Sequence, residues 1–393
     1  MNNQTINHIS IIGGAGHVGL PLGLAFASKN FKIHLIDKNK KALKSIKQNK
    51  MPFLEIGAKK LLRKANKKKL FFYENDLSNI SKSKYIIICI GTPIDKKLKP
   101  DLISFYGLIK KLKNRINKKQ ILIIRSSVLP GTNQKIKEIL KNKNSNIVYG
   151  PERIVQSKSL IELPKLPQIL ACEKNNVFES SKKLFLKISK KIIRTSILEA
   201  ELIKLYSNAN RYINFAIANQ LYTICHLNNL NFKRVRNIMQ DGYARNLNLA
   251  NAGFTAGPCL VKDTMQLKYF TRNSFPLGSA AMKVNENIPN LIIDKLKMFK
   301  NYKSKIIGLL GLSFKGETDD IRDSLSIVLL KKLKKLNLKI LQSDEYYKAK
   351  NGISKKELIK RSDIIIIGAP HRAYKKLKIN KKKKKLIDIW DII

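Results

Sequence analysis

The feature that most constrains the fold is an apolar strand that runs into a glycine-rich turn, a helix and a second strand. It covers residues 8–37, HISIIGGAGHVGLPLGLAFASKNFKIHLID. Gly14, Gly16 and Gly19 have the spacing GxGxxG, which permits a tight turn, close backbone approach to a pyrophosphate and close packing of helix on strand. Asp37 ends the second strand, where a carboxylate binds the adenine ribose hydroxyls and opposes a 2'-phosphate. The stretch therefore predicts a dinucleotide-binding α/β domain that takes NAD.

Other residues are expected to lie beside the same cofactor. His17 and Val18 lie inside the glycine turn, and three later apolar runs end in Gly, Pro, Ser or Thr. The runs are KYIIICIGTP (84–93), QILIIRSSVLPGT (120–132) and NIVYGPER (146–153). Because ligands bind at the carboxyl edge of a parallel sheet, Thr92, Ser127 and Glu152 on these strand ends are candidate site residues.

The chain is too long for one hydrophobic core, so two or three domains are expected from its 393 residues. Helical periodicity covers about 197–240 and resumes after a loop, up to about residue 300. A second α/β pattern begins at KSKIIGLLGLSFK (303–315), without GxGxxG, and runs to the C-terminus. The predicted order is therefore sheet domain, helical region, sheet domain.

The net charge is extreme, since 78 Lys and Arg face 27 Asp and Glu, for a formal +51. Such a charge attracts nucleic acid and anionic membranes without specificity. The lysines are scattered along solvated faces and turns, and arginines and aromatics do not cluster with them as in a nucleic-acid module. We therefore expect no specific nucleic-acid partner.

The cysteines indicate a reducing compartment. Cys89, Cys172, Cys225 and Cys259 are far apart, with no paired metal-ligand spacing, so neither a disulfide framework nor a metal site is expected. A strand begins by about residue 8, which leaves no room for a signal peptide. No apolar run reaches the ~18 residues that a membrane span needs. A cytoplasmic location is the expectation.

One cysteine stands apart because it lies in a loop that regular structure cannot accommodate, GFTAGPCLVKD (253–263). Glycines and a proline precede Cys259, and a cation and an anion, Lys262 and Asp263, follow it. By itself this loop allows two interpretations. The thiol either fills a loop as a small hydrophobe or is a nucleophile tuned by its neighbours.

Lys204 and Asn208, four residues apart in AELIKLYSN, share a helix face. With them, seven ordered motifs extend over nearly the whole chain. They are GGAGHVGLPLG, GTP, RSSVLPGT, PER, AELIKLYSN, GPCLVKD and LGLSFKGETDDIRDS. The sequence thereby resembles the UDP-glucose/GDP-mannose dehydrogenase family, whose members oxidise the C6 alcohol of a nucleotide sugar to a carboxylate.

The resemblance implies two Rossmann-like parallel-sheet domains joined by a central helical dimerisation domain. The expected boundaries are 1–195 for NAD binding, 196–300 for the helical domain with the cysteine loop, and 301–393 for UDP-sugar binding. It also implies NAD as cofactor, a UDP-sugar as substrate and a homodimer as the assembly.

The resemblance assigns the central chemistry to four residues. Cys259 matches the nucleophile that carries the sugar as a thiohemiacetal and then a thioester. Lys204 matches the lysine that stabilises developing oxyanion charge, and Asn208 the asparagine that orients the reacting oxygen. Asp263 matches the carboxylate that acts as acid and base.

Further roles follow from the same resemblance. Ser127 keeps a hydroxyl near the reacting centre, and Lys262 and Arg322 match cations that contact cofactor or phosphate. Lys315, in FKGETDD, matches a UDP-sugar contact, and Arg245, in GYARN, corresponds to an arginine that reaches the partner subunit's site.

The chain departs from the family where a second glutamate often follows four residues after the PE motif, since Gln156 stands there. Glutamine cannot act as a base, so water activation is expected to rest on Glu152 or Asp263. UDP-glucose is the default substrate, with UDP-N-acetylmannosamine or UDP-N-acetylglucosamine as the alternative.

Two rival functions remain weaker. A two-electron β-hydroxyacid dehydrogenase shares the Rossmann domain and the Lys/Asn pair but needs neither Cys259 nor a second α/β domain. A basic nucleic-acid-binding or membrane-binding protein with a vestigial fold predicts a damaged site, whereas the four central residues are intact.

Overall fold

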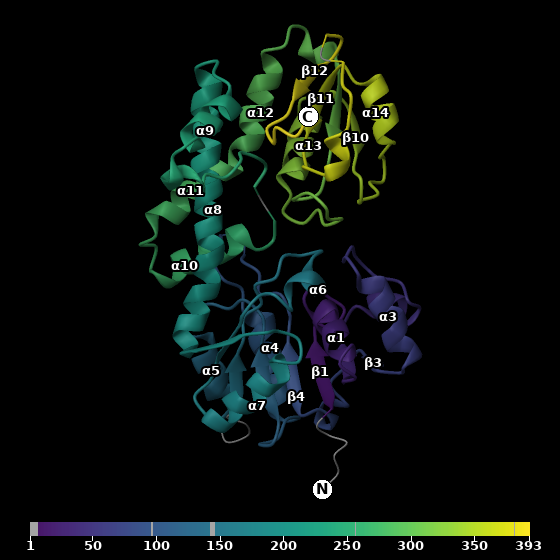
Figure 1. The fold of residues 1–393 in the computed structure, drawn as a ribbon, viewed down its shortest axis with the longest axis vertical. Coiled ribbons are helices and arrows are strands. Elements are labelled where there is room, and N and C mark those ends of the chain that lie inside the picture. The colour runs from purple at the N-terminus through teal and green to yellow at the C-terminus, as the bar shows by residue number, and fades with distance from the viewer. Residues whose placement is uncertain (1–6, 96, 142–145, 256, 381) are drawn as a thin grey trace. The chain divides into compact units, whose positions relative to one another are not determined.

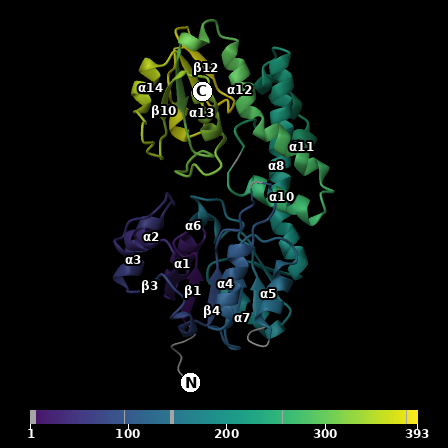
Figure 2. The same ribbon diagram turned by 180° about the vertical axis from the view of Figure 1, so that it is seen from behind.

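The computed structural model describes residues 7–95, 97–141, 146–255, 257–380 and 382–393. The chain divides into two compact units, Met1–Tyr206 and Ser207–Ile393. Each unit contains one mostly parallel sheet with helices on both faces, as Figures 1 and 2 show. The predicted α/β class with parallel sheets and a helical region between them is confirmed.

In the first unit the strands of the sheet follow the order β3-β2-β1-β4-β5-β6-β7-β8. Their bounds are β1 His8–Ile12, β2 Lys32–Ile36, β3 Phe71–Glu74, β4 Tyr85–Ile88, β5 Ile121–Ile124, β6 Ile147–Tyr149, β7 Gln168–Ala171 and β8 Ile192–Thr195. The pairing is parallel except between β6 and β7, which are antiparallel. The chain order reverses beside β1, which places the carboxyl ends of β1 and β4 at the switch point where α/β sheets bind ligands.

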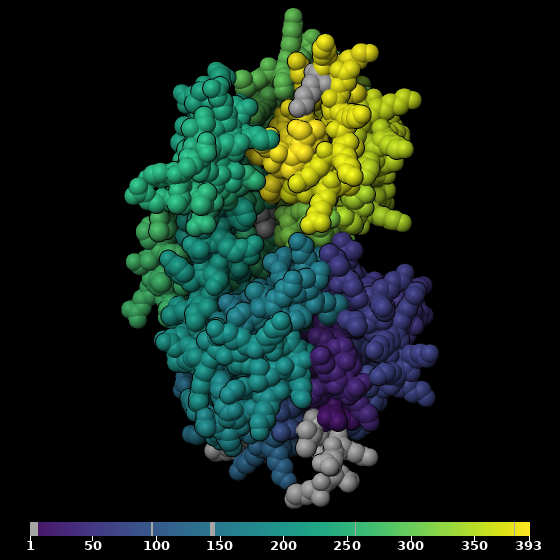
Figure 3. All heavy atoms as spheres, in the orientation of Figure 1, coloured from purple at the N-terminus to yellow at the C-terminus, as the bar shows by residue number. Residues whose placement is uncertain are grey.

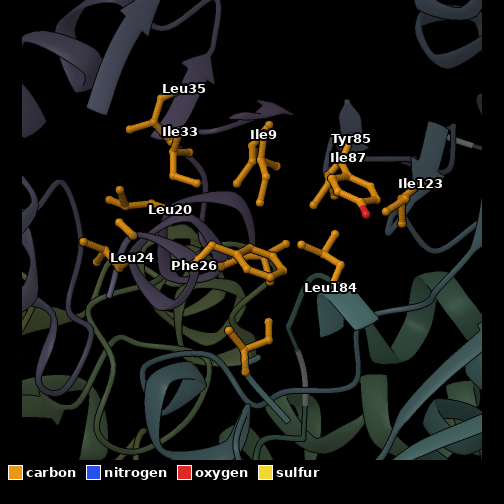
Figure 4. Close-up of a cluster of buried hydrophobic side chains, with 14 of the residues drawn as sticks. Ile9, Leu20, Leu24, Phe26, Ile33, Leu35, Tyr85, Ile87, Ile123 and Leu184 are labelled. Carbon is orange, nitrogen blue, oxygen red and sulfur yellow. The ribbon is translucent and has the colours of Figure 1, made fainter. Parts of the chain in front are cut away.

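Helices cover both faces of this sheet. They are α1 Gly19–Ala27, α2 Lys40–Lys47, α3 Ala58–Lys67, η1 Ile80–Lys82, α4 Ile103–Lys113, α5 Thr132–Leu140, α6 Ser159–Glu162 and α7 Asn175–Phe185. Alternate residues of one strand face opposite layers, because side chains in a strand alternate. Ile87 packs with Phe26 of α1 and Leu184 of α7 (Figure 4), whereas Ile88 packs in the cluster formed with α4 and α5. Burial on both faces explains the unbroken isoleucine runs.

Helix α8, Ile197–Leu227, begins in the first unit and continues into the second. It is followed by α9 Phe232–Gln240, η2 Ala244–Asn246, α10 Leu260–Phe270, α11 Pro276–Glu286, α12 Ile288–Lys297 and η3 Tyr302–Ser304. This confirms the predicted helical stretches. Among the described residues, no helix is long and apolar enough to cross a membrane.

The second unit ends in a parallel sheet with the order β10-β9-β11-β12. Its elements are β9 Ile306–Leu310, α13 Leu325–Lys335, β10 Lys339–Ser343, α14 Lys355–Arg361, β11 Ile364–Ile367, η4 Arg372–Tyr374 and β12 Lys385–Ile387. Alternate residues of β11 again serve two layers, since Ile366 packs in the cluster that contains α13 and Ile367 packs with Leu358 of α14. In the space-filling view the surface of this C-terminal part runs from green to yellow (Figure 3).

Candidate active site

The glycine turn after β1 has the close backbone contacts that a dinucleotide site requires. Gly13 has a φ of +82°, and a Cβ on Gly14 would lie 2.8 Å from the carbonyl oxygen of Ile11. A Cβ on Gly19, the first residue of α1, would lie 2.2 Å from the carbonyl oxygen of Gly13. These positions therefore exclude any larger side chain, and the N-terminus of α1 closes a turn that fits a pyrophosphate.

Asp37 lies beside this turn, as the sequence predicts. Its Oδ2 accepts a hydrogen bond from the backbone N–H of Ala15 at 3.0 Å, and its Oδ1 accepts one from Asn39 at 2.9 Å. The carboxylate is thus held in place at the carboxyl end of β2, where the ribose of a dinucleotide binds. The residues present fit NAD.

His17 connects the turn to two other segments of the first unit. Its ring packs against the ring of Phe53 with centroids 4.0 Å apart, and the Nε2 of Gln156 lies 3.0 Å from its Nδ1. Gln156, the residue that replaces a frequent glutamate, therefore contacts the cofactor turn. An uncharged amide at this position adds no negative charge beside a site for a pyrophosphate.

Thr92 and Ser127 meet at the carboxyl ends of β4 and β5. The hydroxyl of Thr92 donates a hydrogen bond to the carbonyl oxygen of Ser127, and the Thr92 residue is buried. The neighbouring Ser126 donates to the carbonyl oxygen of Ile90 at 2.7 Å. These bonds join the two loops, so the prediction that both strand ends meet at one edge of the sheet is confirmed.

Glu152 is held by a buried cation. Its Oε2 accepts from the guanidinium of Arg125, while its Oε1 accepts from the backbone N–H groups of Arg153 and Ile154 at 2.9 and 3.2 Å. Arg125 also donates to Gln168 at 3.0 Å. Since the charge is paired and the oxygens are bonded, Glu152 is a fixed anion in this arrangement.

Lys204 lies near the start of α8, and Glu201 anchors that part of the helix. The carboxylate of Glu201 accepts from the backbone N–H groups of Gly131 and Asn133 at 2.8 and 3.1 Å, and from the Asn133 side chain at 2.7 Å. These amides lie at the N-terminus of α5, where a carboxylate is favourable. The contact fixes Lys204, three residues later, relative to the loop that carries Ser127.

Asn208 lies one helical turn after Lys204, and its side chain contacts Asp263. The Nδ2 of Asn208 donates to Oδ2 of Asp263 at 2.6 Å, and Nζ of Lys262 lies 2.5 Å from Oδ1. Asp263 is fully buried. The structure therefore brings together a carboxylate, an ammonium and an amide, three of the groups that the sequence singled out.

Cys259 lies immediately before α10, and its carbonyl oxygen accepts from the backbone N–H of Asp263 at 2.9 Å. Cys259 is exposed, whereas Cys172 and Cys225 are buried. A hydrogen bond to Asp320 raises the pKa of Arg322, and the charge of the Cys259 thiolate raises it further. The Arg322 guanidinium therefore lies within electrostatic range of the Cys259 sulfur.

Cys89 and Cys172 differ from Cys259 in the environment of their thiols. Burial raises the pKa of the Cys89 thiol to about 12, and burial also raises the pKa of Cys172. A raised pKa lowers the thiolate fraction, so burial makes both thiols weaker nucleophiles. This result agrees with the prediction that both are inert.

The two predicted substrate contacts, Lys315 and Arg245, lie in different segments of the second unit. Lys315 lies in the loop after β9, with its Nζ 5.9 Å from the centroid of the Phe314 ring. Arg245 is exposed in η2, and its guanidinium lies over the ring of Tyr243 at 4.8 Å. That Arg245 reaches the partner subunit's site stays a prediction.

Sequence reasoning missed Arg125 and Glu201. Arg125 ends the apolar run ILIIR one strand away from Glu152, and pairing neighbouring strand ends by charge could have found it. Glu201 precedes Lys204 by three residues in the AELIK motif. Within the part of the chain that the structure describes, no group of three or more His, Cys, Asp or Glu side chains could hold a metal ion.

Comparison with known proteins matches three family models to this chain. The UDP-glucose/GDP-mannose dehydrogenase family's NAD binding domain matches residues 7–189, its central domain 198–287 and its UDP binding domain 308–393. These matches cover most of the chain, and they confirm the resemblance and the NAD-binding assignment.

Individual known proteins that resemble this chain have low sequence identity to it. A UDP-N-acetyl-D-mannosamine dehydrogenase of Methanococcus vannielii is 28% identical over 388 residues, covering 95% of this chain and 88% of the relative. A UDP-glucose 6-dehydrogenase of Rickettsia bellii is 25% identical over 340 residues, covering 81% and 77%. The solved UDP-D-ManNAc dehydrogenase of Pyrococcus horikoshii has a TM-score of 0.88 at 24% identity, covering 98% of this chain and 96% of that one, and it shows the fold.

Proposed function

Because the chain belongs to the UDP-glucose/GDP-mannose dehydrogenase family and is an NAD-dependent nucleotide-sugar dehydrogenase, we propose that its substrate is a UDP-N-acetylhexosamine of the mannosamine type. The reaction would convert the C6 alcohol to the carboxylate. The observation that carries the oxidation, as distinct from the choice of sugar, is that Asn208 of α8 and Lys262 both contact Asp263, four residues after Cys259. A four-electron oxidation needs a nucleophile as well as a base, and this segment supplies both.

NAD, when bound, supplies the hydride acceptor for both oxidations. Gly14, Gly16, His17, Val18 and Gly19 would hold its pyrophosphate, and Asp37 its adenine ribose. Thr92, Lys262 and Arg322 are proposed as further cofactor or phosphate contacts.

Lys204 and Asn208 are proposed to act on the oxygen of C6. An ammonium and an amide N–H on one helix face stabilise the negative charge that develops when this oxygen loses its proton. Asp263 would accept that proton, since it is buried and already bonded to the Asn208 side chain at 2.6 Å.

Cys259 is proposed to retain the sugar between the two oxidations. Its thiolate would form a bond to C6 at the aldehyde level, and the thiohemiacetal would become a thioester in the second oxidation. Water would then attack the thioester carbonyl, releasing the carboxylate and regenerating the thiolate. A free thiol stays reduced in the cytoplasm, so we propose the cytoplasm as its location.

The group that activates this water is proposed to be Glu152 or Asp263. Replacing Glu152 with Gln should leave a sugar adduct on Cys259 if Glu152 is the base, and intact-protein mass spectrometry would detect the added mass. Replacing Asp263 with Asn should instead slow the first oxidation without an adduct. The opposite pattern would reverse the two roles.

The identity of the sugar rests on relatives rather than on a contact. The sequence alone favours UDP-glucose by default, but several relatives at 24–28% identity are named UDP-N-acetyl-D-mannosamine dehydrogenase. UDP-glucose remains the second candidate, because others at 25–27% identity are named UDP-glucose 6-dehydrogenase.

A substrate panel tests the proposal. The purified protein would be incubated with NAD and UDP-N-acetylmannosamine, UDP-N-acetylglucosamine, UDP-glucose or GDP-mannose, and NADH would be followed by absorbance. We expect the highest kcat/KM for UDP-N-acetylmannosamine and two NADH per sugar acid. A higher value for UDP-glucose would select the second candidate, and one NADH per sugar would contradict the thioester route.

We also propose that the protein is a homodimer, with helix α8 as part of the interface. Ile217, Ile224 and Leu227 are 53%, 47% and 73% exposed and lie at helical spacing on one face of α8. A second copy would cover this face, since a two-fold interface pairs the same patch on both chains. Replacing Ile224 with Lys should yield monomers in analytical ultracentrifugation. An unchanged sedimentation coefficient would place the interface elsewhere.

A further inference from the structure

Three loops meet at the carboxyl edge of the second sheet, and a buried histidine joins them. The loops follow β9, β10 and β11, the strands that form the centre and one side of that sheet. In a parallel sheet this edge is where nucleotides bind. The loop after β9 carries Lys315 and Arg322, two of the residues predicted to contact cofactor or substrate.

His371, in the loop after β11, is fully buried, and both of its ring nitrogens are bonded. The backbone N–H of Glu317 donates to its Nδ1 at 3.0 Å. Because Nδ1 accepts, the ring proton resides on Nε2, which donates to Oδ2 of Asp344 at 3.2 Å. The rings of Tyr346 and Tyr374 pack edge-on against the imidazole, each with centroids 5.1 Å away.

Asp344, the partner of His371, begins the loop after β10. Its Oδ2 also accepts from the backbone N–H groups of Leu312 and Ser313 at 2.6 and 3.0 Å. Burial by itself would raise the pKa of Asp344, but the bonds from His371 and from backbone amides outweigh it and lower the pKa. Asp344 is therefore a buried anion that holds the start of the β9 loop.

The part of the β9 loop around Gly316 and Glu317 is held by contacts with the loop that contains His371. Glu317 has a φ of +56°, a conformation that a residue with a side chain adopts only when its surroundings hold it. A Cβ on Gly316 would lie 2.4 Å from the carbonyl oxygen of Pro370, so the two loops touch through their backbones. The carboxylate of Glu317 accepts from the backbone N–H of Arg372 at 2.8 Å.

The Asp344 carboxylate of the second unit has a counterpart in the first unit, Asp37. Asp37 and Asp344 each follow the second strand of an α/β unit, and each accepts from backbone N–H groups of the turn after the first strand. Both residues are partly exposed, but the Asp344 side chain is fully buried and its Oδ2 lies 3.2 Å from Nε2 of His371. Asp344 is thus an anchor for the loops, because its buried carboxylate accepts from the turn after β9 and from His371.

We propose that His371 is a positioning residue for the nucleotide of the substrate, acting through the backbone N–H of Glu317 to fix the loop that presents Lys315. It contacts no substrate atom itself. This inference rests on the proposed function, because it concerns the binding of the UDP moiety at the same site. It deepens that proposal by assigning a residue that no sequence motif of the site contains.

Two substitutions test the roles of Nδ1 and Nε2 of His371 separately. The Oδ1 of asparagine occupies the position of Nδ1, so His371→Asn keeps an acceptor for Glu317. The Nε2 of glutamine occupies the position of the ring Nε2, so His371→Gln keeps a donor for Asp344 and loses that acceptor. His226→Asn, at the end of α8 in the same unit, is the matched control.

UDP alone is the probe, and its Kd would be measured by isothermal titration calorimetry on the full-length protein. Loss of one hydrogen bond that orders a binding loop should weaken binding by about tenfold. We therefore expect His371→Gln to bind UDP about tenfold more weakly, and His371→Asn and the control to stay within about threefold of wild type. Turnover measurements should distinguish the variants in the same way. His371→Gln should have a raised KM for the UDP-sugar and a nearly unchanged kcat.

The outcomes are distinguishable. Equal UDP affinity in His371→Gln and wild type would overturn the positioning role while leaving the proposed function intact. Equal weakening in both variants would also overturn it, because the effect would then come from general damage to the loops. Failure of the wild type to bind UDP would overturn the proposed function and this inference together.

Discussion

Replacing Arg125 with Met is expected to lower the unfolding free energy of the first unit by about 3–5 kcal/mol. The side chain of Arg125 is 0% exposed and that of Glu152 is 6% exposed, so the variant leaves a buried carboxylate without its cation. Methionine keeps apolar contact with the ring of Phe185, which lies 5.0 Å from the guanidinium carbon. The loss would therefore measure charge rather than volume.

The double variant Arg125→Met with Glu152→Gln removes the charge as well as its partner. It should recover to within about 2 kcal/mol of wild type, because replacing a buried pair by neutral groups is often nearly neutral. Lys137→Met is the matched control in the same unit. It breaks an ion pair with Glu173 whose side chains are 34% and 60% exposed, and it should cost less than about 1 kcal/mol.

Urea unfolding followed by far-UV circular dichroism provides the measurement. The single tryptophan, Trp390, belongs to the second unit, so its fluorescence reports that unit separately. The Arg125→Met loss should appear in the dichroism transition and not in the fluorescence transition. A double variant as unstable as Arg125→Met, or a single variant within 1 kcal/mol of wild type, would refute the reasoning that Glu152 is a fixed buried anion.

Other predictions concern the reaction. Cys259→Ala should lose acid formation, and iodoacetamide should label Cys259 before Cys89, whose thiol has its pKa raised to about 12; full activity in the variant would leave the thiol a loop-filling side chain. Lys204→Ala should lower kcat far more than it raises KM, and a change confined to KM would make Lys204 a phosphate contact. Asp37→Ser should raise kcat/KM for NADP relative to NAD, because the carboxylate that opposes a 2'-phosphate is gone; an unchanged ratio would show that Asp37 does not select the cofactor.

Much of the first unit was predictable from local sequence. The apolar run before Gly14 and the glycine spacing leave few alternatives to a strand, a tight turn and a helix, since any side chain at Gly19 collides with backbone. The four-residue spacing of Lys204 and Asn208 likewise places both on one helix face. The family also follows from sequence, because seven motifs in fixed order are an internal check on one another.

Contacts between distant residues were decided only by the tertiary structure. The Asn208–Asp263 bond, the Arg125–Glu152 pair and the His371–Asp344 pair join residues 55, 27 and 27 positions apart. No periodicity encodes such distances, because they depend on which strand ends the sheet order brings together. The antiparallel pairing of β6 with β7 was also not predicted, since short buried strands have the same apolar pattern in either direction. Sequence therefore determined which groups the protein has, and the packing of its sheets determined which of them meet.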